Sequence, residues 1–408
     1  MTSRQRVLAA LNHREADRVP IDLSGHRSSG MAALLYPKLR ARLGLPPEAV
    51  RVYDPIQQLA IVGADVLERF GVDTLELGRG FALEPRHWRE WPLPDGTPAF
   101  MPAWALPARE TGRWVLKSGS GRVLGQMVDG SYYFEQTFWP LAEDPGQAMD
   151  ECLWTAVGSP PGPLTAGAEG LKLLEQGASA LSRSSQRAIL GLFGGNLVEM
   201  GQFLYGMDRF LYMLAAEPRA VHRFLDRVVE IHLEKLERFL GAVGSWIDII
   251  VFGDDMGMQT GPQFSPAMYR EFFKPRHAQL WARAKELARV KVNLHCCGGV
   301  RELLPDLIDA GLDAINPVQT SCAGMEPAGL KRDFGSDLVF WGGGCDTQEV
   351  LPRGTPEQVR EHVRERVTLL APGGGFVFQQ VHNILAFVPP EHVVAMLDSV
   401  NPGARRGA

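Results

Sequence analysis

Short apolar runs alternate with longer stretches of helical periodicity from about residue 188 to the end of the chain. The helical stretches have typical starts: Pro266 follows Ser265, and Thr355 and Gln358 form a capping-box pattern. Strands that alternate with helices pair in parallel, because each helix returns the chain to the same end of the sheet. The apolar runs cover residues 188–195, 247–255, 290–299, 312–319, 338–346 and 375–383.

Polar residues or glycines follow each apolar run at its carboxyl end. In an α/β barrel the loops after the strands converge at one mouth and build the functional site there. We therefore expect a (β/α)8 TIM-type barrel with Asp254, His295, Gln319, Cys345 and His382 around one mouth. An open doubly wound sheet would also place its site at carboxyl strand ends, but no G-x-G-x-x-G pattern follows an early strand.

A second pattern lies upstream, where two β-rich stretches within residues 111–128 are joined by a Ser/Gly turn. This arrangement predicts a β-hairpin inserted before the alternating region.

The composition narrows the classes of partner. The 408 residues are 45 % hydrophobic and 22 % charged, with a formal net charge of -5. A mildly acidic chain without a basic stripe is not expected to bind nucleic acid, and no apolar run is long enough to span a membrane. We expect a cytoplasmic protein whose five cysteines are reduced thiols and therefore available for metal binding.

His295 and Cys297 are the candidate metal ligands, in the stretch "NLHCCGG". Side chains alternate along an extended chain, so these two project to one side and Cys296 to the other. Imidazole and thiolate are ligands that zinc prefers, at about 2.0–2.1 Å for nitrogen and about 2.3 Å for sulfur. The alternative interpretation is a buried small cysteine beside a hydrogen-bonded histidine.

A third ligand would come from another strand end, and both Cys345 and His382 qualify. Cys152 and Cys322 lie in a helical stretch and a loop, and we expect both to be structural. Asp254 and Asp255 are candidates for general acid or base chemistry. Because adjacent side chains on a strand face opposite ways, one should reach the site while the other caps a helix or lies on the surface.

Several motifs resemble those of the uroporphyrinogen decarboxylase superfamily. They are "MTSRQRVLAALNHREADRVPIDLSG", "DDMGMQTGPQFSPAMYREFFKP", "LHCCGGVRELLPDLIDAGLDAINPVQ", "GGGCDTQEVLPRGTPEQV" and "APGGGFVFQQVHNILAFVPPEH". The resemblance implies a single barrel domain over residues 1–400, with a helical N-terminal extension at 1–70 and a flexible tail at 401–408. The superfamily contains porphyrinogen decarboxylases and zinc-dependent, corrinoid-linked methyltransferases.

Departures from the decarboxylase motifs favour the methyltransferase branch. The decarboxylase segments "RQAGR" and "FSDIL" are replaced by "DLSGHRSSGM" and "FGVDTLELG", which retain only Arg27 and Asp73 as partial counterparts. These two and Asn196 are our candidate substrate-binding residues. A porphyrinogen binder needs many cations for its carboxylates, and no dense arginine cluster stands near the strand ends.

In the methyltransferase branch an H-x-C motif supplies two zinc ligands, which match His295 and Cys297. The third ligand there is a cysteine in the last strand loop, and His382 occupies that place here. A carboxylate near the metal in relatives is replaced around Gln319, which we take as a third catalytic candidate beside the two aspartates.

The resemblance implies one zinc ion per chain and methyl transfer between a corrinoid and a thiol or folate acceptor. None of the ten histidines has an aspartate two positions before it, so the D-x-H-x-x-G segment that binds corrinoids is missing. The corrinoid is therefore expected on a partner protein. Two alternatives stay open: a metal-free decarboxylase acting on a carboxylated tetrapyrrole, and a non-catalytic binding subunit. The oligomeric state is open as well.

Overall fold

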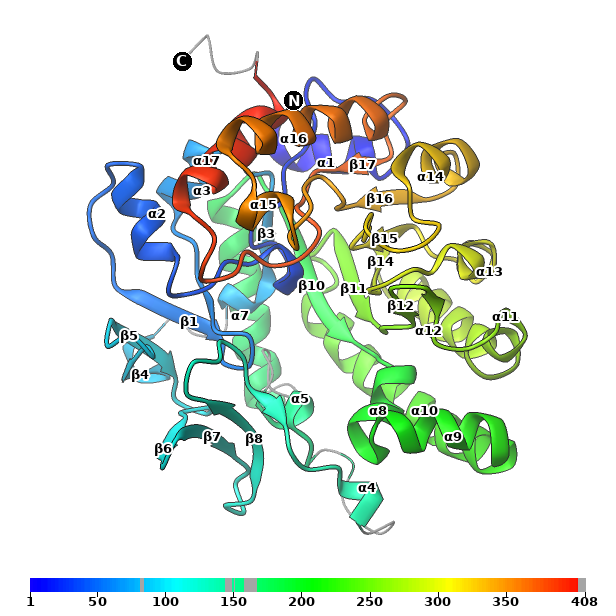
Figure 1. Cartoon of the computed structure of the whole chain (residues 1–408). Helices are drawn as coiled ribbons and strands as arrows, with labels where there is room; N and C mark the ends of the chain where they lie inside the picture. Colours follow the sequence, from blue (N-terminus) through cyan, green and yellow to red (C-terminus); the bar gives the residue numbers. More distant parts are fainter. Residues whose placement is uncertain (81–83, 144–148, 150, 158–166, 403–408) are drawn as a thin grey trace.

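A curled parallel sheet lies at the centre of the computed structural model, which describes residues 1–80, 84–143, 149, 151–157 and 167–402 (Figure 1). Its strand order is β17-β16-β15-β14-β11-β10-β3. Each of the six predicted apolar runs forms one of these strands, which confirms the parallel sheet. The strands are β3 (Thr74–Glu76), β10 (Ala188–Gly194), β11 (Ile249–Gly253), β14 (Lys291–His295), β15 (Ala314–Asn316), β16 (Val339–Trp341) and β17 (Phe376–Val377).

A short extended segment around Ile21 closes the sheet into a barrel. Ile21 forms a parallel bridge with Phe378, and the Asp22 amide donates to the Phe378 carbonyl oxygen at 2.8 Å. On its other side the carbonyl oxygen of Ile21 accepts from the Asp73 amide at 2.8 Å. This segment therefore takes the place of a strand between β17 and β3, and the predicted (β/α)8 barrel is confirmed.

Helix α1 (Ser3–Ala10) closes the amino end of the barrel. The Arg4 amide donates to the Gln186 carbonyl oxygen at 2.7 Å, and the Gly375 amide donates to the Ala10 carbonyl oxygen at 3.2 Å. Gln186 and Gly375 both precede strands, so α1 lies opposite the carboxyl mouth. The barrel interior is filled by apolar side chains from α1 and the strands: Val7, Ala10, Leu11, Ala188, Leu190, Ile249, Val251, Ala314, Val339, Trp341 and Val377.

The helices from α7 onward surround the sheet, as Figure 1 shows. They are α7 (Ala168–Ser184), α8 (Val198–Tyr205), α9 (Met207–Ala216), α10 (Pro218–Val243), α11 (Pro266–Met268), η4 (Tyr269–Phe273), α12 (Lys274–Leu287), η5 (Arg301–Leu303), α13 (Leu304–Asp309), α14 (Pro327–Phe334), α15 (Val350–Arg353), α16 (Pro356–Leu370) and α17 (Pro390–Val400). The Ser265 cap and the Thr355 capping box are both formed as predicted.

The N-terminal region differs from the expected helical extension. Helices α2 (Tyr36–Arg42) and α3 (Ala64–Arg69) are present, but so are strands β1 (Val50–Asp54) and β2 (Leu59–Ala60). Residues 1–70 also contain the segment that closes the barrel, so this region is part of the barrel rather than an appendage. Of the predicted tail, residues 403–408 lie outside the described residues.

The inserted region carries the predicted hairpin, formed by β7 (Arg113–Lys117) and β8 (Val123–Val128) in antiparallel register. Strands β6 (Ala108–Glu110) and β9 (Glu135–Gln136) extend it to four strands, and β4 (Trp88–Pro92) pairs with β5 (Pro98–Pro102) beside β1. Short helices α4 (Pro140–Glu143) and α5 (Leu153–Ala156) follow. Figure 1 shows this region in cyan, beside the barrel mouth.

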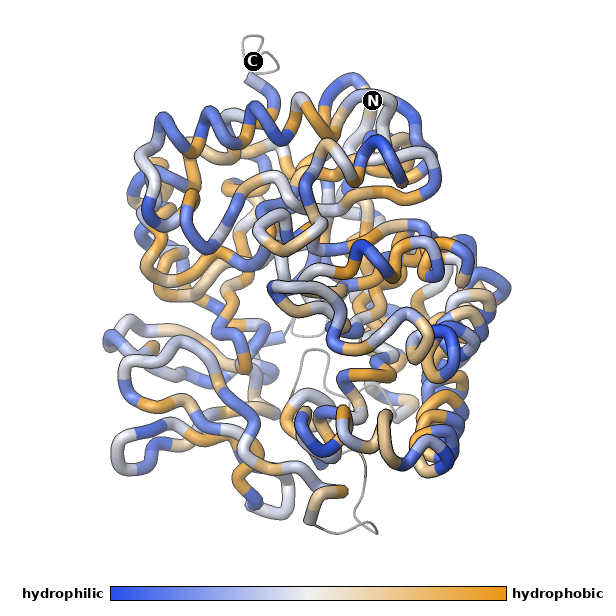
Figure 2. The backbone as a smooth tube through the Cα atoms, turned by 45° about the vertical axis from the view of Figure 1, so that its right-hand side comes forward, coloured by the Kyte–Doolittle hydropathy of each residue, from blue (hydrophilic) through white to orange (hydrophobic). Residues whose placement is uncertain are grey.

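Hydrophobic and hydrophilic residues alternate along the outer helices, as the colours of Figure 2 show. In α10 the buried residues recur every three or four positions from Val221 to Val243. This is the pattern of a helix with one face on a core. In the part of the chain that the structure describes, no helix combines the length and the apolar character needed to cross a lipid bilayer.

Asp73, a predicted substrate-binding residue, is structural, and that prediction was wrong. It precedes β3 at the amino end of the barrel and its side chain is fully buried. Its carboxylate accepts from Arg18 at 2.7 and 2.9 Å, from Arg6 at 3.2 Å and from the Ile21 amide at 2.9 Å. Asp73 therefore ties the closing segment to β3, because a buried carboxylate is stable only when it is paired.

We predict that Asp73→Ala lowers the free energy of unfolding by about 3–5 kcal/mol, because Arg18 loses its carboxylate partner and Arg6 loses one of two. Urea denaturation followed by circular dichroism measures this change. The control is Asp129→Ala, which removes an exposed ion pair with Arg109 and should change the midpoint little. Equal midpoints for Asp73→Ala and the wild type would contradict the structural role.

Candidate metal centre

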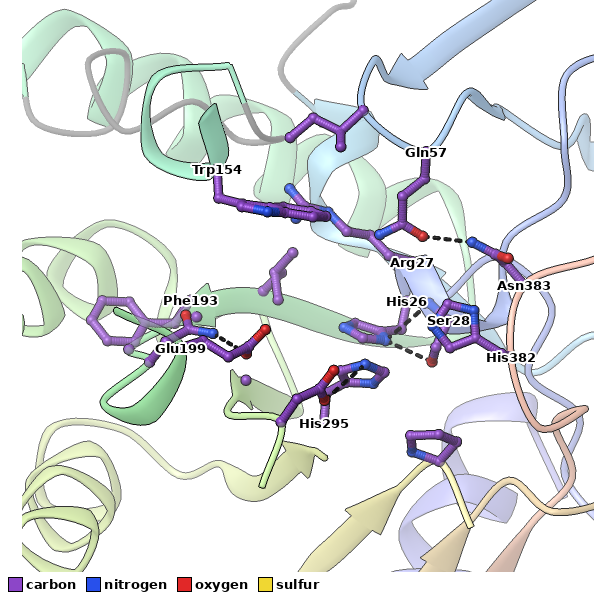
Figure 3. Close-up of a pocket in the computed structure, with 18 of the residues that line it drawn as sticks. His26, Arg27, Ser28, Gln57, Trp154, Phe193, Glu199, His295, His382 and Asn383 are labelled. Carbon is purple, nitrogen blue, oxygen red and sulfur yellow. Dashed lines mark hydrogen bonds and ion pairs between the residues drawn. The ribbon is translucent and has the colours of Figure 1, made fainter. Parts of the chain in front are cut away.

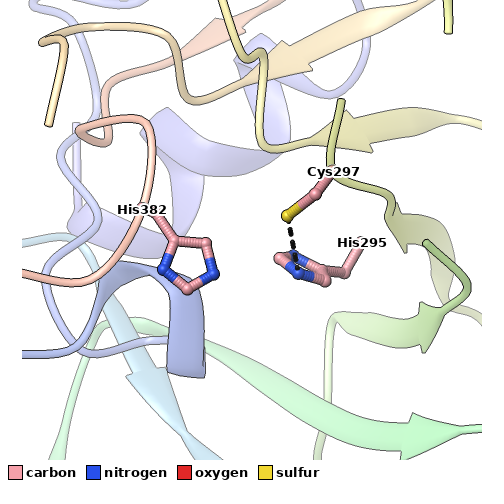
Figure 4. A group of neighbouring side chains, drawn as sticks. All are labelled: His295, Cys297 and His382. Atoms are coloured by element: carbon pink, nitrogen blue, oxygen red, sulfur yellow. Dashed lines mark hydrogen bonds between the residues drawn. The ribbon is translucent and has the colours of Figure 1, made fainter. Parts of the chain in front are cut away.

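Three side chains that could bind a metal meet at the carboxyl ends of the strands. The ligand atoms of His295, Cys297 and His382 all lie within 4.8 Å of one another. His295 is the last residue of β14, Cys297 follows it, and His382 stands in the loop after β17 (Figure 4). The prediction that His295 and Cys297 project to the same side is confirmed, since Sγ of Cys297 lies 3.5 Å from Nε2 of His295.

Asn316 fixes the orientation of the His295 ring. Its Nδ2 donates to the Trp341 carbonyl oxygen at 3.0 Å and to Oε1 of Gln379 at 2.8 Å, so its Oδ1 is the acceptor that faces His295. Nδ1 of His295 donates to this oxygen at 2.8 Å. With its proton on Nδ1, the imidazole presents the lone pair of Nε2 toward Cys297, as a metal ligand requires.

Backbone contacts hold the loop that carries Cys297. The Cys297 amide donates to Oδ1 of Asp255 at 2.7 Å, and the Gly298 amide donates to Oε1 of Gln319 at 2.9 Å. Gly298 has a φ of +92°, and a Cβ atom there would collide with the backbone of Gly257. Only glycine allows the chain to turn away directly after Cys297.

The chemistry of this donor set fits zinc. Two imidazoles and one thiolate leave a fourth position open, which is the composition of catalytic zinc sites. Tetrahedral nitrogen and sulfur ligands of zinc lie about 3.5 Å apart, which matches the measured 3.5 Å between Cys297 and His295. Burial lowers the pKa of His382 to about 4, so its imidazole is neutral and able to coordinate.

The surroundings of the Cys297 thiol disfavour its ionised form. Burial, and then the Asp255 carboxylate, raise the pKa of Cys297 well above its usual value. A thiolate in this environment therefore requires a positive charge close to the sulfur.

Cys345 does not join the group, although the sequence allowed it as an alternative to His382. Its side chain is fully buried, and Sγ lies 3.7 Å from the Asp346 carbonyl oxygen. Cys296 is buried behind the loop, where its sulfur accepts from the Met256 amide at 3.4 Å. Cys152 and Cys322 are buried elsewhere. The geometry therefore favours His382 as the third ligand.

The two adjacent aspartates divide as predicted. Asp255 lines the cavity at the mouth, with Oδ1 3.8 Å from Nε2 of His295. Asp254 is fully buried, and its carboxylate accepts from the amides of Leu197 at 3.1 Å and Glu199 at 2.9 Å. Asp254 therefore caps the amino end of α8, and its proposed catalytic role is wrong.

A cavity of about 680 Å³ is lined by His295 and His382 of the three candidate ligands. Asn196, Gln319 and Arg27 line it, whereas Asp73, Asp254 and Cys345 do not. Nε of Arg27 lies 2.8 Å from Oδ2 of Asp54, and its guanidinium group stands 5.8 Å from the centre of the Trp154 ring. Figure 3 shows Arg27 and Trp154 together along one side of this pocket.

The cavity residues that the sequence analysis missed include His26 and Glu199. His26 lies with its ring centre 5.1 Å from that of His295, and Nδ1 is 2.9 Å from Oγ of Ser28. Glu199 faces the cavity from the first turn of α8. An acidic residue just after the "FGGN" strand end could have identified Glu199, but His26 follows a segment too short to be recognised as a strand.

A family profile described as Uroporphyrinogen decarboxylase (URO-D) matches residues 185–402, just over half of the chain. The chain belongs to the uroporphyrinogen decarboxylase family. It is similar to the methylated-thiol–coenzyme M methyltransferase of Methanosarcina mazei, with 27 % identity over 165 residues, which are 39 % of this chain and 40 % of the relative.

It is also similar to the uroporphyrinogen decarboxylase of Psychromonas ingrahamii, with 26 % identity over 192 residues, which are 46 % of this chain and 50 % of the relative. The chain thus spans half or less of the length of these two relatives. Among solved structures, a methyltransferase from Methanosarcina mazei shares the fold with a TM-score of 0.60 at 16 % identity, over 98 % of this chain and 99 % of that one.

We predict that His295→Ala, Cys297→Ala and His382→Ala each lower zinc affinity by orders of magnitude, because each removes one donor of three. Cys345→Ala is the matched control and should keep the wild-type affinity. Competition with a chromophoric chelator measures the affinity. Loss of zinc from Cys345→Ala but not from His382→Ala would reverse the assignment.

We further predict that Asn316→Ala weakens zinc binding by about 10- to 100-fold, because His295 loses the acceptor that holds its ring and tautomer. The chelator competition is repeated on protein whose fold is verified by circular dichroism. A folded Asn316→Ala variant with unchanged affinity would show that Asn316 does not orient the ligand.

Proposed function

We propose that this chain is a zinc-dependent methyltransferase that moves a methyl group between a corrinoid carried by a partner protein and a small molecule, with a thiol or a folate as acceptor. The proposal rests on one observation, the group formed by His295, Cys297 and His382 at the cavity. The similarity to a methylated-thiol–coenzyme M methyltransferase supports it. A porphyrinogen decarboxylase needs no such set of donors.

Zinc bound by these three residues would act as a Lewis acid that lowers the pKa of a thiol acceptor and orients it. The protein's own part is to keep the ligands in place before the acceptor arrives. Asn316 holds His295, while Asp255 and Gln319 hold the loop of Cys297 and Gly298. Ligands held in this way need no rearrangement when the substrate binds.

The cavity charges favour this proposal over a decarboxylase. The cations that line it within the described residues are Arg27, Lys235 and Arg238. Arg27 already faces Asp54, and Arg238 pairs with Glu234 at the exposed rim on α10. A porphyrinogen with several carboxylates would need more cations than this cavity offers.

We predict that the purified protein binds about one zinc ion per chain and transfers methyl groups from free methylcobalamin to a thiol or to tetrahydrofolate. Cobalamin absorbance follows the transfer. Chelation and Cys297→Ala should both abolish it, while Cys345→Ala should keep it.

Full zinc content and full activity in Cys297→Ala would refute the proposal. A protein that binds no zinc but decarboxylates a porphyrinogen would be a decarboxylase. One that binds the partner without any transfer would be a binding subunit.

A further inference from the structure

Aromatic side chains line the part of the cavity beside the metal centre. The Trp154 ring stacks on Phe203, with ring centres 5.8 Å apart and an angle of 22° between the planes. Phe193 packs against Phe239 and Phe252 at 5.7 and 5.5 Å. In Figure 3, Trp154 lies along the upper side of the pocket, and Phe193 and Glu199 lie along the lower side. Walls of this kind bind a flat, uncharged ring.

Glu199 lines this cavity near the carboxyl groups of Asp255 and Asp254. Its Oε2 accepts from Nδ2 of Asn196 at 2.6 Å, and its amide is held by Asp254. The Asn196 carbonyl oxygen in turn accepts from Nε2 of His232 at 2.9 Å, which fixes the start of α8. Within the described part of the chain, no cation pairs with Glu199.

This environment disfavours the charged form of Glu199. Burial in the cavity wall, followed by the charges of Asp255 and Asp254, raises its pKa well above the usual value. A protonated carboxyl group can donate a proton but cannot accept the one that a thiol releases.

We propose that the cavity takes an aryl methyl ether as methyl donor and that Glu199 is the catalytic acid that protonates the ether oxygen. This inference rests on the proposed function and concerns the half-reaction that loads the corrinoid of the partner protein. The aryl methyl ether is the methyl donor in this half-reaction, and the thiol or folate of the proposed function is the methyl acceptor in the other.

The step balances with a reduced Co(I) corrinoid as co-substrate. Its electron pair forms the new bond to the methyl carbon, while the bond between that carbon and the ether oxygen breaks. The electron pair of the broken bond stays on the oxygen, which takes the proton of Glu199. The products are the methylated corrinoid, a neutral phenol and the Glu199 carboxylate, which regains a proton from solvent.

An oxygen leaving group explains why the reaction needs an acid such as Glu199 in the cavity. A phenol has a pKa of about 10 and a thiol one of about 8.5, so phenolate is the poorer leaving group and gains more from protonation. The ring of an aryl ether also matches walls built from Trp154, Phe203 and Phe193.

The test compares donors that differ in how much they need the acid. Zinc-loaded enzyme is mixed with free cob(I)alamin and either anisole or 4-cyanoanisole, and phenol release and cobalamin absorbance are followed. We expect Glu199→Gln to slow transfer from anisole by about 10²- to 10⁴-fold. Transfer from 4-cyanoanisole should slow much less, because cyanophenolate is a better leaving group than phenolate and needs the proton less. Glu175→Gln is the control, an exposed carboxylate on α7.

A second measurement tests the aromatic walls without any turnover. Calorimetric titration should show that anisole binds more tightly than cyclohexyl methyl ether, and that Trp154→Ala removes this preference. Equal binding of the two ethers would overturn the inference, as would an equal loss with both donors in Glu199→Gln.

The two proposals fail in different ways. Methyl transfer from methylcobalamin to a thiol, with no reaction from either ether in the wild type, overturns only the aryl ether inference. Absence of zinc and of every methyl transfer overturns the proposed function, and the inference falls with it.

Discussion

The buried amide of Asn316 connects the parts of the molecule that make the site. Its two donors are taken by the Trp341 carbonyl oxygen and Gln379, and its oxygen accepts from Ser28 at 2.7 Å and from His295 at 2.8 Å. Each of these partners comes from a different stretch of the barrel wall. A buried amide must satisfy all its hydrogen bonds, so the position of Ser28 and the orientation of the His295 ring depend on the same side chain.

The strands after residue 188 could be predicted because each is an apolar run followed by polar residues, and a parallel barrel strand buried on both faces needs that composition. The closing segment around Ile21 could not be predicted from the sequence. It forms a single bridge, and what holds it there is the pairing of Asp22 with Thr74 and Trp341, at 2.7 and 2.8 Å. These partners are distant in sequence, so no local pattern reveals them.

The site residues also divide into those that a local sequence pattern predicts and those that depend on distant contacts. Alternation along an extended chain was sufficient to place His295 and Cys297 together, because that rule is local. It could not decide between Cys345 and His382, since both follow strands and only the course of each loop turns one side chain inward. Asp73 was chosen as the partial counterpart of the decarboxylase aspartate, but it precedes β3 and so lies at the amino end of the barrel, opposite the mouth.

The two adjacent aspartates after β11 set the distance between Glu199 and the candidate ligand Cys297. Asp254 accepts from the amides at the start of α8 and from Nε2 of His277 at 3.0 Å, so it fixes the helix turn that carries Glu199. Asp255 faces the other way and accepts from the Cys297 amide. Because consecutive residues of one strand end hold both, a shift of β11 would move Glu199 and the Cys297 loop together. The spacing that a substrate meets is thus determined by two consecutive residues at the end of a single strand.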